Sequence, residues 1–260
     1  MLDGKQRPAS EHLASSWQDL LNEGRVADAL SAYYAGDEDN LAIGGMLKDL
    51  LNVQRNLREK AWRKAKDLSK TIALSSLNKQ SMVEEIDRLQ EASDALNKRK
   101  PEDALALLDD VYTSLLKGEA NTLRGTAFIY LNDPERARAS FDAALAIDPK
   151  HYRAITNLGN LALEAGEVDS AIASYERALA INEGFSNAHH NLGVALRKKG
   201  QITKSVRSLK KAQGAAQRQA REEARESMRS NNISPKLFRW GFIVIIALLF
   251  IWFLSSQGFI

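Results

Sequence analysis

The four histidines are the side chains of this 260-residue sequence best suited to bind a metal ion or to act as a general base. His189 and His190 are adjacent, so on a helix they point about 100° apart and cannot chelate one ion together. His12 and His151 stand far from them in the sequence. The absence of cysteine excludes thiolate metal sites, cysteine nucleophiles and disulfides. The sequence therefore predicts no metal site.

Residues that could bind phosphate or carry out hydrolysis form no recognisable motif. The sequence holds no glycine-rich loop that ends in Gly-Lys-Ser/Thr, and neither HExxH nor GxSxG occurs. The carboxylates are dispersed over segments predicted to be helical, as ordinary solvation of helix surfaces requires. We therefore expect that the protein is not an enzyme and that it needs no cofactor.

Lysine and arginine concentrate near the C-terminus. Residues 197–239 hold 13 Lys/Arg and 3 Asp/Glu, residues 1–196 hold 23 and 30, and residues 240–260 carry no charge. The basic stretch lacks the interleaved aromatic residues on which nucleic-acid bases stack, so no nucleic-acid partner is expected. Anionic lipid is the expected polyanion, because each cation near such a surface contributes about 1 kcal/mol. The alternative is a charged spacer that only solubilises the chain.

An uncharged apolar run ends the sequence, and residues 240–254 read WGFIVIIALLFIWFL. At ~1.5 Å per residue, the run 240–260 reaches roughly 31 Å, which matches a hydrocarbon core of ~30 Å. Trp240 and Trp252 lie near the two ends, where indole rings prefer the membrane interface, and Lys236 and Arg239 precede the run. The sequence predicts a single transmembrane helix that serves as a tail anchor. The alternative is a buried core helix.

The predicted orientation follows from the charges around this run. All nearby Lys/Arg lie on its N-terminal side, and the beginning of the sequence has no apolar run that could serve as a signal peptide. We therefore expect the N-terminal domain in the cytoplasm. The lack of basic residues after the run and the Ala/Arg-rich composition favour a bacterial inner membrane.

Three segments repeat at a spacing of 34 residues. NLGN at 157–160 and NLGV at 191–194 align, and their glycines, Gly159 and Gly193, are matched by Gly125. After each glycine come a polar turn and then a helical segment in which a small residue precedes a bulky one by four positions. A fixed period of this length predicts a solenoid of helical hairpins.

Small and bulky residues are complementary between the two helices of each predicted repeat. The glycines let the backbones approach, and we expect Phe141, Tyr175 and Leu209 to fill the space opposite them. Gly166 and Gly200 are expected to end the first helices of their repeats in the left-handed conformation.

These motifs resemble the tetratricopeptide repeat, a 34-residue helix–turn–helix unit. The resemblance is close over 118–213, where the first and second blocks read AxxxFxxALAIDP and AxxxYxxALAIN. It implies an all-α solenoid of tetratricopeptide-type helical hairpins, here followed by the single C-terminal transmembrane helix, and a protein-binding function. Asn121 and Arg124 stand where the family prefers tryptophan and leucine, so looser packing is expected in the first repeat.

The signal is weaker before residue 118. Ala104 and Leu108 indicate a degenerate repeat, residues 10–36 indicate another helix pair, and a long amphipathic helix is predicted from Leu41 to Ala73. The predicted organisation is an N-terminal helical region at 1–83, a degenerate repeat at 84–117, three tetratricopeptide repeats at 118–213, a basic juxtamembrane helix and hinge at 214–239, and the anchor at 240–260.

The resemblance also implies a partner-binding surface, because the first helix of each such repeat lines the concave face. Asn157 and Asn191 stand one repeat apart, and a ladder of amides can pair with the backbone of an extended peptide. The alternative is that these asparagines bond the neighbouring repeat. The basic residues with which chaperone-binding members hold a terminal carboxylate are missing. The predicted partner-binding residues are Thr126, Tyr130, Arg153, Asn157, Asn160, Asn187, His190, Asn191, Arg197 and Lys198.

The favoured function is that of a membrane-tethered adaptor or scaffold whose cytoplasmic repeats bind an extended segment or a helix of a partner protein. The first alternative is a permanent structural or assembly subunit of a larger membrane complex, of the secretion, pilus or photosynthetic type. A second alternative, a regulator of an enzyme or an organiser of lipids, rests on the basic stretch alone.

Overall fold

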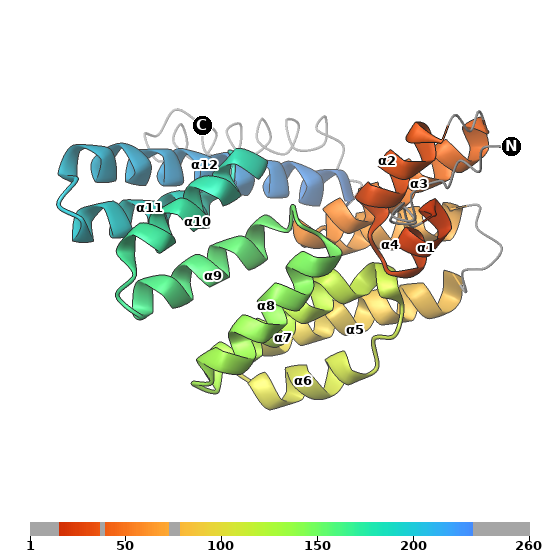
Figure 1. Ribbon diagram of the computed structural model, residues 1–260, viewed down its shortest axis with the longest axis horizontal. Helices are drawn as coiled ribbons and strands as arrows, with labels where there is room; N and C mark the ends of the chain where they lie inside the picture. Colours follow the sequence, from red (N-terminus) through yellow and green to blue (C-terminus); the bar gives the residue numbers. More distant parts are fainter. Residues whose placement is uncertain (1–15, 37–39, 73–78, 231–260) are drawn as a thin grey trace, which may run out of the picture.

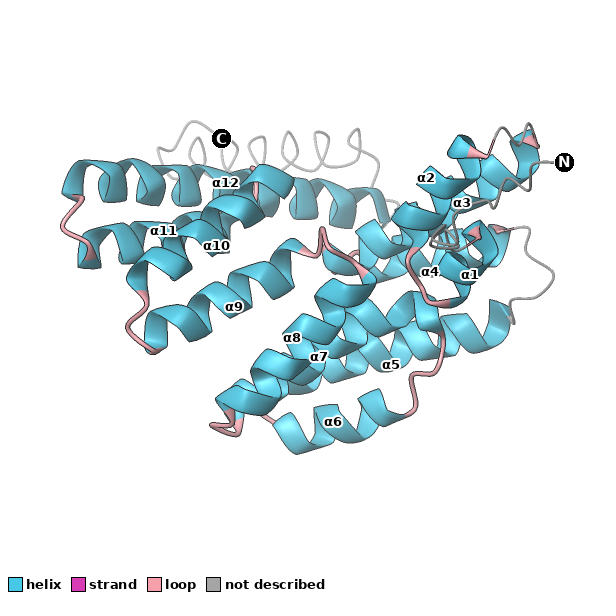
Figure 2. Ribbon diagram, in the orientation of Figure 1, coloured by secondary structure: helices cyan, strands magenta, loops and turns pink. Residues whose placement is uncertain are grey.

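The computed structural model describes residues 16–36, 40–72 and 79–230, and these residues form helices and no strand (Figures 1 and 2). The predicted all-α fold is confirmed in this part of the chain. The helices are α1 (Trp17–Asn22), α2 (Val26–Ala35), α3 (Leu41–Arg58), α4 (Trp62–Thr71), α5 (Lys79–Asn97), α6 (Pro101–Asp109), the short 3-10 helix η1 (Ser114–Leu116), α7 (Lys117–Tyr130), α8 (Pro134–Ile147), α9 (Tyr152–Glu164), α10 (Val168–Ile181), α11 (Ser186–Lys198) and α12 (Ile202–Ser230).

One type of turn joins the described helices in pairs. In each turn the N–H of the left-handed residue donates to the carbonyl three positions earlier. The N–H of the next residue donates to the carbonyl five positions earlier, and this second bond measures 2.8–2.9 Å. This pair of hydrogen bonds caps a helix that is followed by a left-handed residue. Gly166 and Gly200 have the left-handed φ values of 84° and 80° that the sequence predicts. The left-handed residues are Gly24, Lys60, Arg99, Asn132, Gly166 and Gly200.

A buried small residue follows each of these turns at the same distance. Five positions after the left-handed residue, the second helix places a side chain no more than 2% exposed against the first helix. A small side chain there lets two helices pack closely. The hairpins α1–α2, α3–α4, α5–α6, α7–α8, α9–α10 and α11–α12 therefore share one register. The six residues are Ala29, Ala65, Ala104, Ala137, Ala171 and Ser205.

The glycines of α7, α9 and α11 lie directly against bulky side chains, as the sequence predicts. A Cβ atom on Gly159 would lie 2.7 Å from the ring of Tyr175. The corresponding distances are 2.5 Å from Gly125 to Phe141 and 2.8 Å from Gly193 to Leu209. At such distances the facing side chain would have to move, so each glycine permits the close fit of its hairpin.

The predicted long helix from Leu41 to Ala73 is wrong. α3 ends at Arg58, Lys60 adopts a φ of 56°, and α4 begins at Trp62. The apolar periodicity continues across this turn because both helices bury their apolar faces in the same core. Ala73 itself lies outside the described residues.

Successive hairpins stack beside one another from the N-terminal end to α12 (Figure 1). α12 continues without a break to Ser230, past the end of the third predicted repeat, and its C-terminal part lines a groove together with the α3–α4 turn. No helix within the described ranges is long and apolar enough to cross a membrane. The predicted anchor, with Lys236, Arg239, Trp240 and Trp252, lies outside those ranges.

Candidate binding groove

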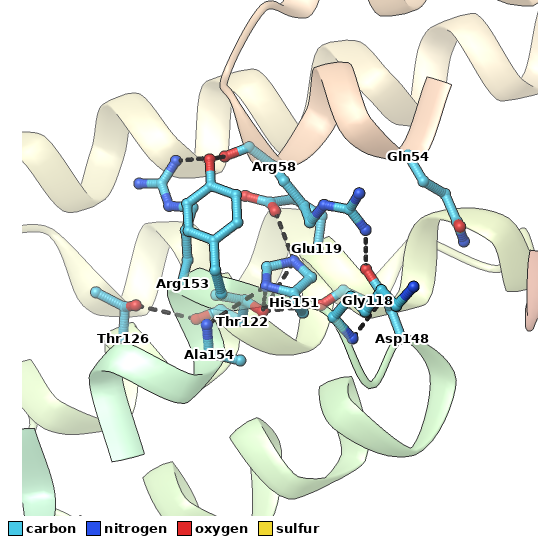
Figure 3. A network of polar contacts seen from close by, with 12 residues as sticks. Gln54, Arg58, Gly118, Glu119, Thr122, Thr126, Asp148, His151, Arg153 and Ala154 are labelled. Carbon is cyan, nitrogen blue, oxygen red and sulfur yellow. Dashed lines mark hydrogen bonds and ion pairs between the residues drawn. The ribbon is translucent and has the colours of Figure 1, made fainter. Parts of the chain in front are cut away.

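Polar contacts join the α3–α4 turn to the beginning of α9 (Figure 3). Arg58, at the end of α3, forms an ion pair with Asp148 in the α8–α9 turn, and both side chains are mostly buried. The backbone carbonyl of Arg58 accepts a hydrogen bond from the Tyr152 hydroxyl at 3.2 Å and another from the Arg153 guanidinium at 3.1 Å. Hairpins about 90 residues apart in the sequence are thereby held together.

A buried acid–base pair lies next to this contact. Nε2 of His151 lies 3.1 Å from Oε2 of Glu119, and both side chains are 2% exposed. Nδ1 of His151 accepts from the N–H of Ala154 and caps α9, so the ring proton belongs on Nε2 and is donated to Glu119. The pair therefore fixes the beginning of α9 against α7.

Burial and charge act in opposite directions on Glu119. Burial raises the pKa of its carboxyl group, but the interaction with His151, through its hydrogen bond first, and the charges of Arg153 and Lys60 outweigh burial, and the net pKa is below the ordinary value. Burial lowers the pKa of Lys60, and the nearby Arg153 lowers it further. The region therefore holds a cluster of cations around one buried carboxylate.

A groove of about 700 Å³ opens beside this cluster. The α3–α4 turn, the beginning of α9, the α10–α11 loop and the C-terminal half of α12 form its walls. The rings of Tyr152 and Phe185 pack edge to face in its lining, with their centroids 4.8 Å apart. Most other lining residues are charged or carry amides: Arg58, Glu59, Lys60, Lys64, Arg153, Asn182, Asn187, Arg218, Gln219, Glu222 and Glu223.

Comparison with known proteins identifies the C-terminal hairpins. The family model for the tetratricopeptide repeat matches residues 122–186 and 156–221. The matched residues lie in the hairpins from α7 to α12. No curated protein matches the sequence.

Several solved structures match part of the chain. A crystal structure of MamA is 23% identical over 64% of this chain and 95% of that chain, with a TM-score of 0.43. A second crystal structure of MamA is 23% identical over 68% and 96% of the two chains, with a TM-score of 0.42. A MamA RS-1 ArsTM double mutant is 18% identical over 66% and 95%, with a TM-score of 0.41.

Two of the predicted partner-binding residues, Arg153 and Asn187, line the groove. They come from the first helices of the second and third tetratricopeptide repeats, as the resemblance implies. Arg153 also binds the backbone of Arg58, so it connects the groove to the contact between hairpins. Asn187 is exposed at the beginning of α11.

The predicted amide ladder makes bonds between neighbouring repeats. Nδ2 of Asn191 donates to Oδ1 of Asn160 at 2.8 Å, and the hydroxyl of Tyr175 donates to the same oxygen at 2.9 Å. Nδ2 of Asn157 lies 3.5 Å from the hydroxyl oxygen of Thr126. The Asn191–Asn160 and Asn157–Thr126 contacts each span 31 residues and lie 34 residues apart, so they occupy the same place in successive repeats. The structure thus contains the hydrogen bonds of the alternative interpretation, in which the asparagines bond the neighbouring repeat.

The remaining predicted residues lie outside the groove. Tyr130 is 43% exposed at the end of α7, and the guanidinium of Arg99 lies 5.5 Å from the centre of its ring. His190, Arg197 and Lys198 are exposed on α11. The structure therefore divides the predicted residues among the groove, the contacts between repeats and the exposed surface.

The sequence did not identify the groove residues outside the tetratricopeptide repeats. The predicted helix from Leu41 to Ala73 includes Arg58 and Lys60, so it gives no indication of the turn to which they belong. Residues Arg218 to Glu223 of α12 were predicted to be a basic segment near the membrane. One signal was present, because Ala65 follows Lys60 at the distance that separates Ala171 from Gly166.

Proposed function

We propose that this protein is a membrane-tethered adaptor that binds an extended segment of a partner protein in the groove. The observation that carries the proposal is the groove itself, which tetratricopeptide repeats and the α3–α4 turn form together. Its amides, on Asn182, Asn187 and Gln219, can each donate to and accept from the backbone of a bound segment. In this role the protein acts by binding and not by catalysis.

The charges of the lining favour a polar or acidic segment. Five cations and three carboxylates line the groove, and Arg58 is already paired with Asp148. Lys60 donates to the hydroxyl of Ser93 at 2.8 Å. Arg153 and Arg218 stand on opposite walls, α9 and α12, and are suited to hold carboxylates of the segment between them.

The proposed tether is the apolar run 240–260, with Lys236 and Arg239 at the cytoplasmic surface of a bacterial inner membrane. The length of the run, its lack of charge and the basic residues that precede it support this assignment. Only nine residues separate Ser230, the end of α12, from Trp240. The groove would thus stay close to the bilayer, where confinement raises the effective concentration of a weakly bound partner. The basic residues of α12 would add attraction to anionic lipid.

A substitution that fills the groove tests the proposal. Asn187→Trp places a large side chain in the lining, and His190→Trp is a matched control on the same helix outside the groove. Partner proteins are recovered from detergent extracts on the full-length protein, and circular dichroism checks that both variants keep native helicity. We expect Asn187→Trp to lower recovery about tenfold, equivalent to ~1.4 kcal/mol, and His190→Trp to leave it unchanged. Normal recovery by a folded Asn187→Trp variant excludes the groove.

The alternative role, a permanent subunit of a membrane complex, is favoured by a different observation. Ile202 and Val206 of α12 are 57% and 48% exposed. Apolar side chains that remain uncovered at the end of a repeat array are typical of a surface that another element covers.

A further inference from the structure

The first two turns of α12 lack the cover that the same surface has on α10. Val168 and Ile172 of α10 are partly buried against an apolar cluster to which α11 contributes Leu192, Ala195 and Leu196. The residues 34 positions later are Ile202 and Val206, and they are exposed. We call the surface around these two side chains the open end. Among the described residues no helix occupies the place that α11 has on α10.

The apolar character of the open end is not a general requirement of the second helix. In α8 the equivalent positions hold Pro134 and Arg138, which are both exposed. α12 instead has isoleucine and valine at exposed positions, where a polar residue would cost nothing in packing. The repeat register thus indicates what fits there: a helix laid along α12 in the manner of α11.

The charge around the open end indicates the chemistry of that helix. Between Ile202 and Arg221, α12 carries six Lys/Arg and no Asp/Glu, and all six are exposed. A hollow of about 600 Å³ lies beside this surface. Val206, Arg207, Lys210 and Arg218 line it from α12, and Glu183 and His189 line it from the α10–α11 loop and α11. Gly214 also lines it, and no atom lies within 4 Å of the position where its Cβ would be. A helix that fits this surface needs an apolar stripe with carboxylates beside it.

We propose that the open end binds an acidic amphipathic helix of a partner protein. The apolar stripe of that helix packs on Ile202 and Val206, and its carboxylates face Arg207 and Lys210. This surface lies on α12 on the side of Val206, whereas the groove uses the side of Ala215 and Gln219. Arg218 lines both, but Val206, Arg207 and Lys210 line the hollow and not the groove. A lipid surface fits less well, because Ala212 and Ala215 of α12 are buried in the protein and, among its described side chains, Ile202 and Val206 are the only large apolar ones that are exposed.

The absence of cysteine makes a direct test possible. Thr203→Cys puts the sole thiol of the full-length chain in the lining of the hollow, where an environment-sensitive fluorophore reports whether the surface is covered. The probe ligand is a stapled 14-residue helix with leucines at positions i, i+3, i+4 and i+7 and glutamates at most others. A twin with lysines in place of the glutamates is the matched control. The measurement uses full-length protein in zwitterionic nanodiscs.

The acidic helix should shield the fluorophore from iodide, and the lysine twin should bind at least tenfold more weakly. Ile202→Asp with Val206→Asp should weaken binding of the acidic helix at least tenfold, and so should Arg207→Glu with Lys210→Glu. These positions are exposed, so the variants should keep native helicity. A fluorophore at Asn187→Cys, in the groove, should not respond. A failure at the open end is therefore distinguishable from a failure of the groove.

Four results would overturn the proposal. The first is a fluorophore already shielded in the full-length chain and exposed by removal of residues 231–260, which makes the chain's own C-terminal segment the occupant. The second is shielding by vesicles of phosphatidylserine and phosphatidylcholine but not by the acidic helix, which makes it a lipid surface. Equal affinity for the two peptides, or unchanged affinity in the aspartate variant, is equally incompatible with an acidic helix on Ile202 and Val206.

Discussion

The N-terminal hairpins and the tetratricopeptide repeats share one turn geometry but differ in their cores. From α1 to α7, one continuous apolar cluster extends from Leu20 to Ala127 and contains large aliphatic residues such as Leu47, Leu50 and Ile86. The C-terminal clusters are smaller and are each confined to neighbouring helices. The N-terminal hairpins thus depend on a shared volume, whereas each tetratricopeptide repeat depends on its fit to the next.

The fit within one hairpin shows the same difference. In α9–α10 a glycine, Gly159, faces a bulky residue, Tyr175. Counted from the left-handed residue, the equivalent positions of α3–α4 hold Val53 and Ser69, both fully buried. The large and small residues have exchanged helices. One register therefore accommodates either arrangement, provided that the combined volume fills the space between the helices.

The largest expected effect comes from overfilling a glycine position. Gly159→Leu should lower the free energy of unfolding by about 3 kcal/mol, because even the first added carbon would lie 2.7 Å from the Tyr175 ring. Gly214→Ala is the control, since its added carbon meets no atom within 4 Å, and it should raise the free energy of unfolding by roughly 0.5–1 kcal/mol. Urea denaturation followed by circular dichroism measures both. A stable Gly159→Leu variant would contradict the glycine-based fit of the repeats.

This difference explains how much of the fold could be predicted. Gly125, Gly159 and Gly193 keep a constant spacing of 34, so the C-terminal hairpins were visible in the sequence. The left-handed positions up to the turn of the first repeat, at residues 24, 60, 99 and 132, stand 36, 39 and 33 residues apart. Two of them are Lys60 and Arg99, residue types that carry no turn signal. Tertiary packing holds them in place, and local sequence does not reveal that.

The groove could be predicted only in part, for a related reason. Arg153 and Asn187, which the repeat pattern predicts on the partner-binding face, both line the groove. The opposite wall depends on the contact between Arg58 and Asp148, 90 residues apart. No periodicity within either segment encodes such a contact. The amides of Asn157 and Asn191 can pair with a peptide or with a neighbouring repeat, and the sequence pattern is the same in both cases; the contacts to Thr126 and Asn160 are visible only in the structure.

The second prediction separates the two regions. Arg58→Ala should lower the free energy of unfolding by about 2 kcal/mol, because it leaves the mostly buried Asp148 without its cation. The loss should fall on the junction between the N-terminal hairpins and the repeats. Calorimetry should therefore show a broader transition, or two, in place of one. Arg55→Ala, on an exposed side of the same helix, is the control and should change stability by less than ~0.5 kcal/mol. An unaltered Arg58→Ala profile would mean that the two regions are not coupled there.

The third prediction concerns acid and tests the same junction from the side of the repeats. The pKa of Glu119 is lowered in the folded protein, so its ionised form contributes stability that is present above the unfolded pKa, near the ordinary 4.5. That contribution is lost as the pH falls below this value and through the folded pKa. Glu119→Gln should remove it, so the stability of the variant should depend less on pH between about 5 and 3. Urea midpoints measured across this range provide the comparison, and parallel curves for the two proteins would contradict the assignment.

The smallest expected effect tests whether the two regions really share one turn. At Arg99, φ is 57°, and at Gly166 it is 84°, so an alanine at either position adopts a conformation that costs ~1–2 kcal/mol. Glycine avoids that cost but gives up roughly 0.5–1 kcal/mol through its freer unfolded state. At both positions the glycine form should therefore exceed the alanine form in free energy of unfolding by about 0.5–1 kcal/mol.

The pair to compare at residue 99 is Arg99→Gly with Arg99→Ala, because both lose the contact between the guanidinium and the Tyr130 ring and the difference isolates the backbone. At residue 166 the pair is the natural glycine with Gly166→Ala, whose added carbon meets no atom within 4 Å. Equal differences at the two positions mean that turn geometry is common to both regions and that only the cores diverge. A higher free energy of unfolding for glycine at 166 but for alanine at 99 would mean that the N-terminal hairpins turn differently in solution. Without left-handed strain, alanine is the more stable residue because its unfolded state has less conformational entropy.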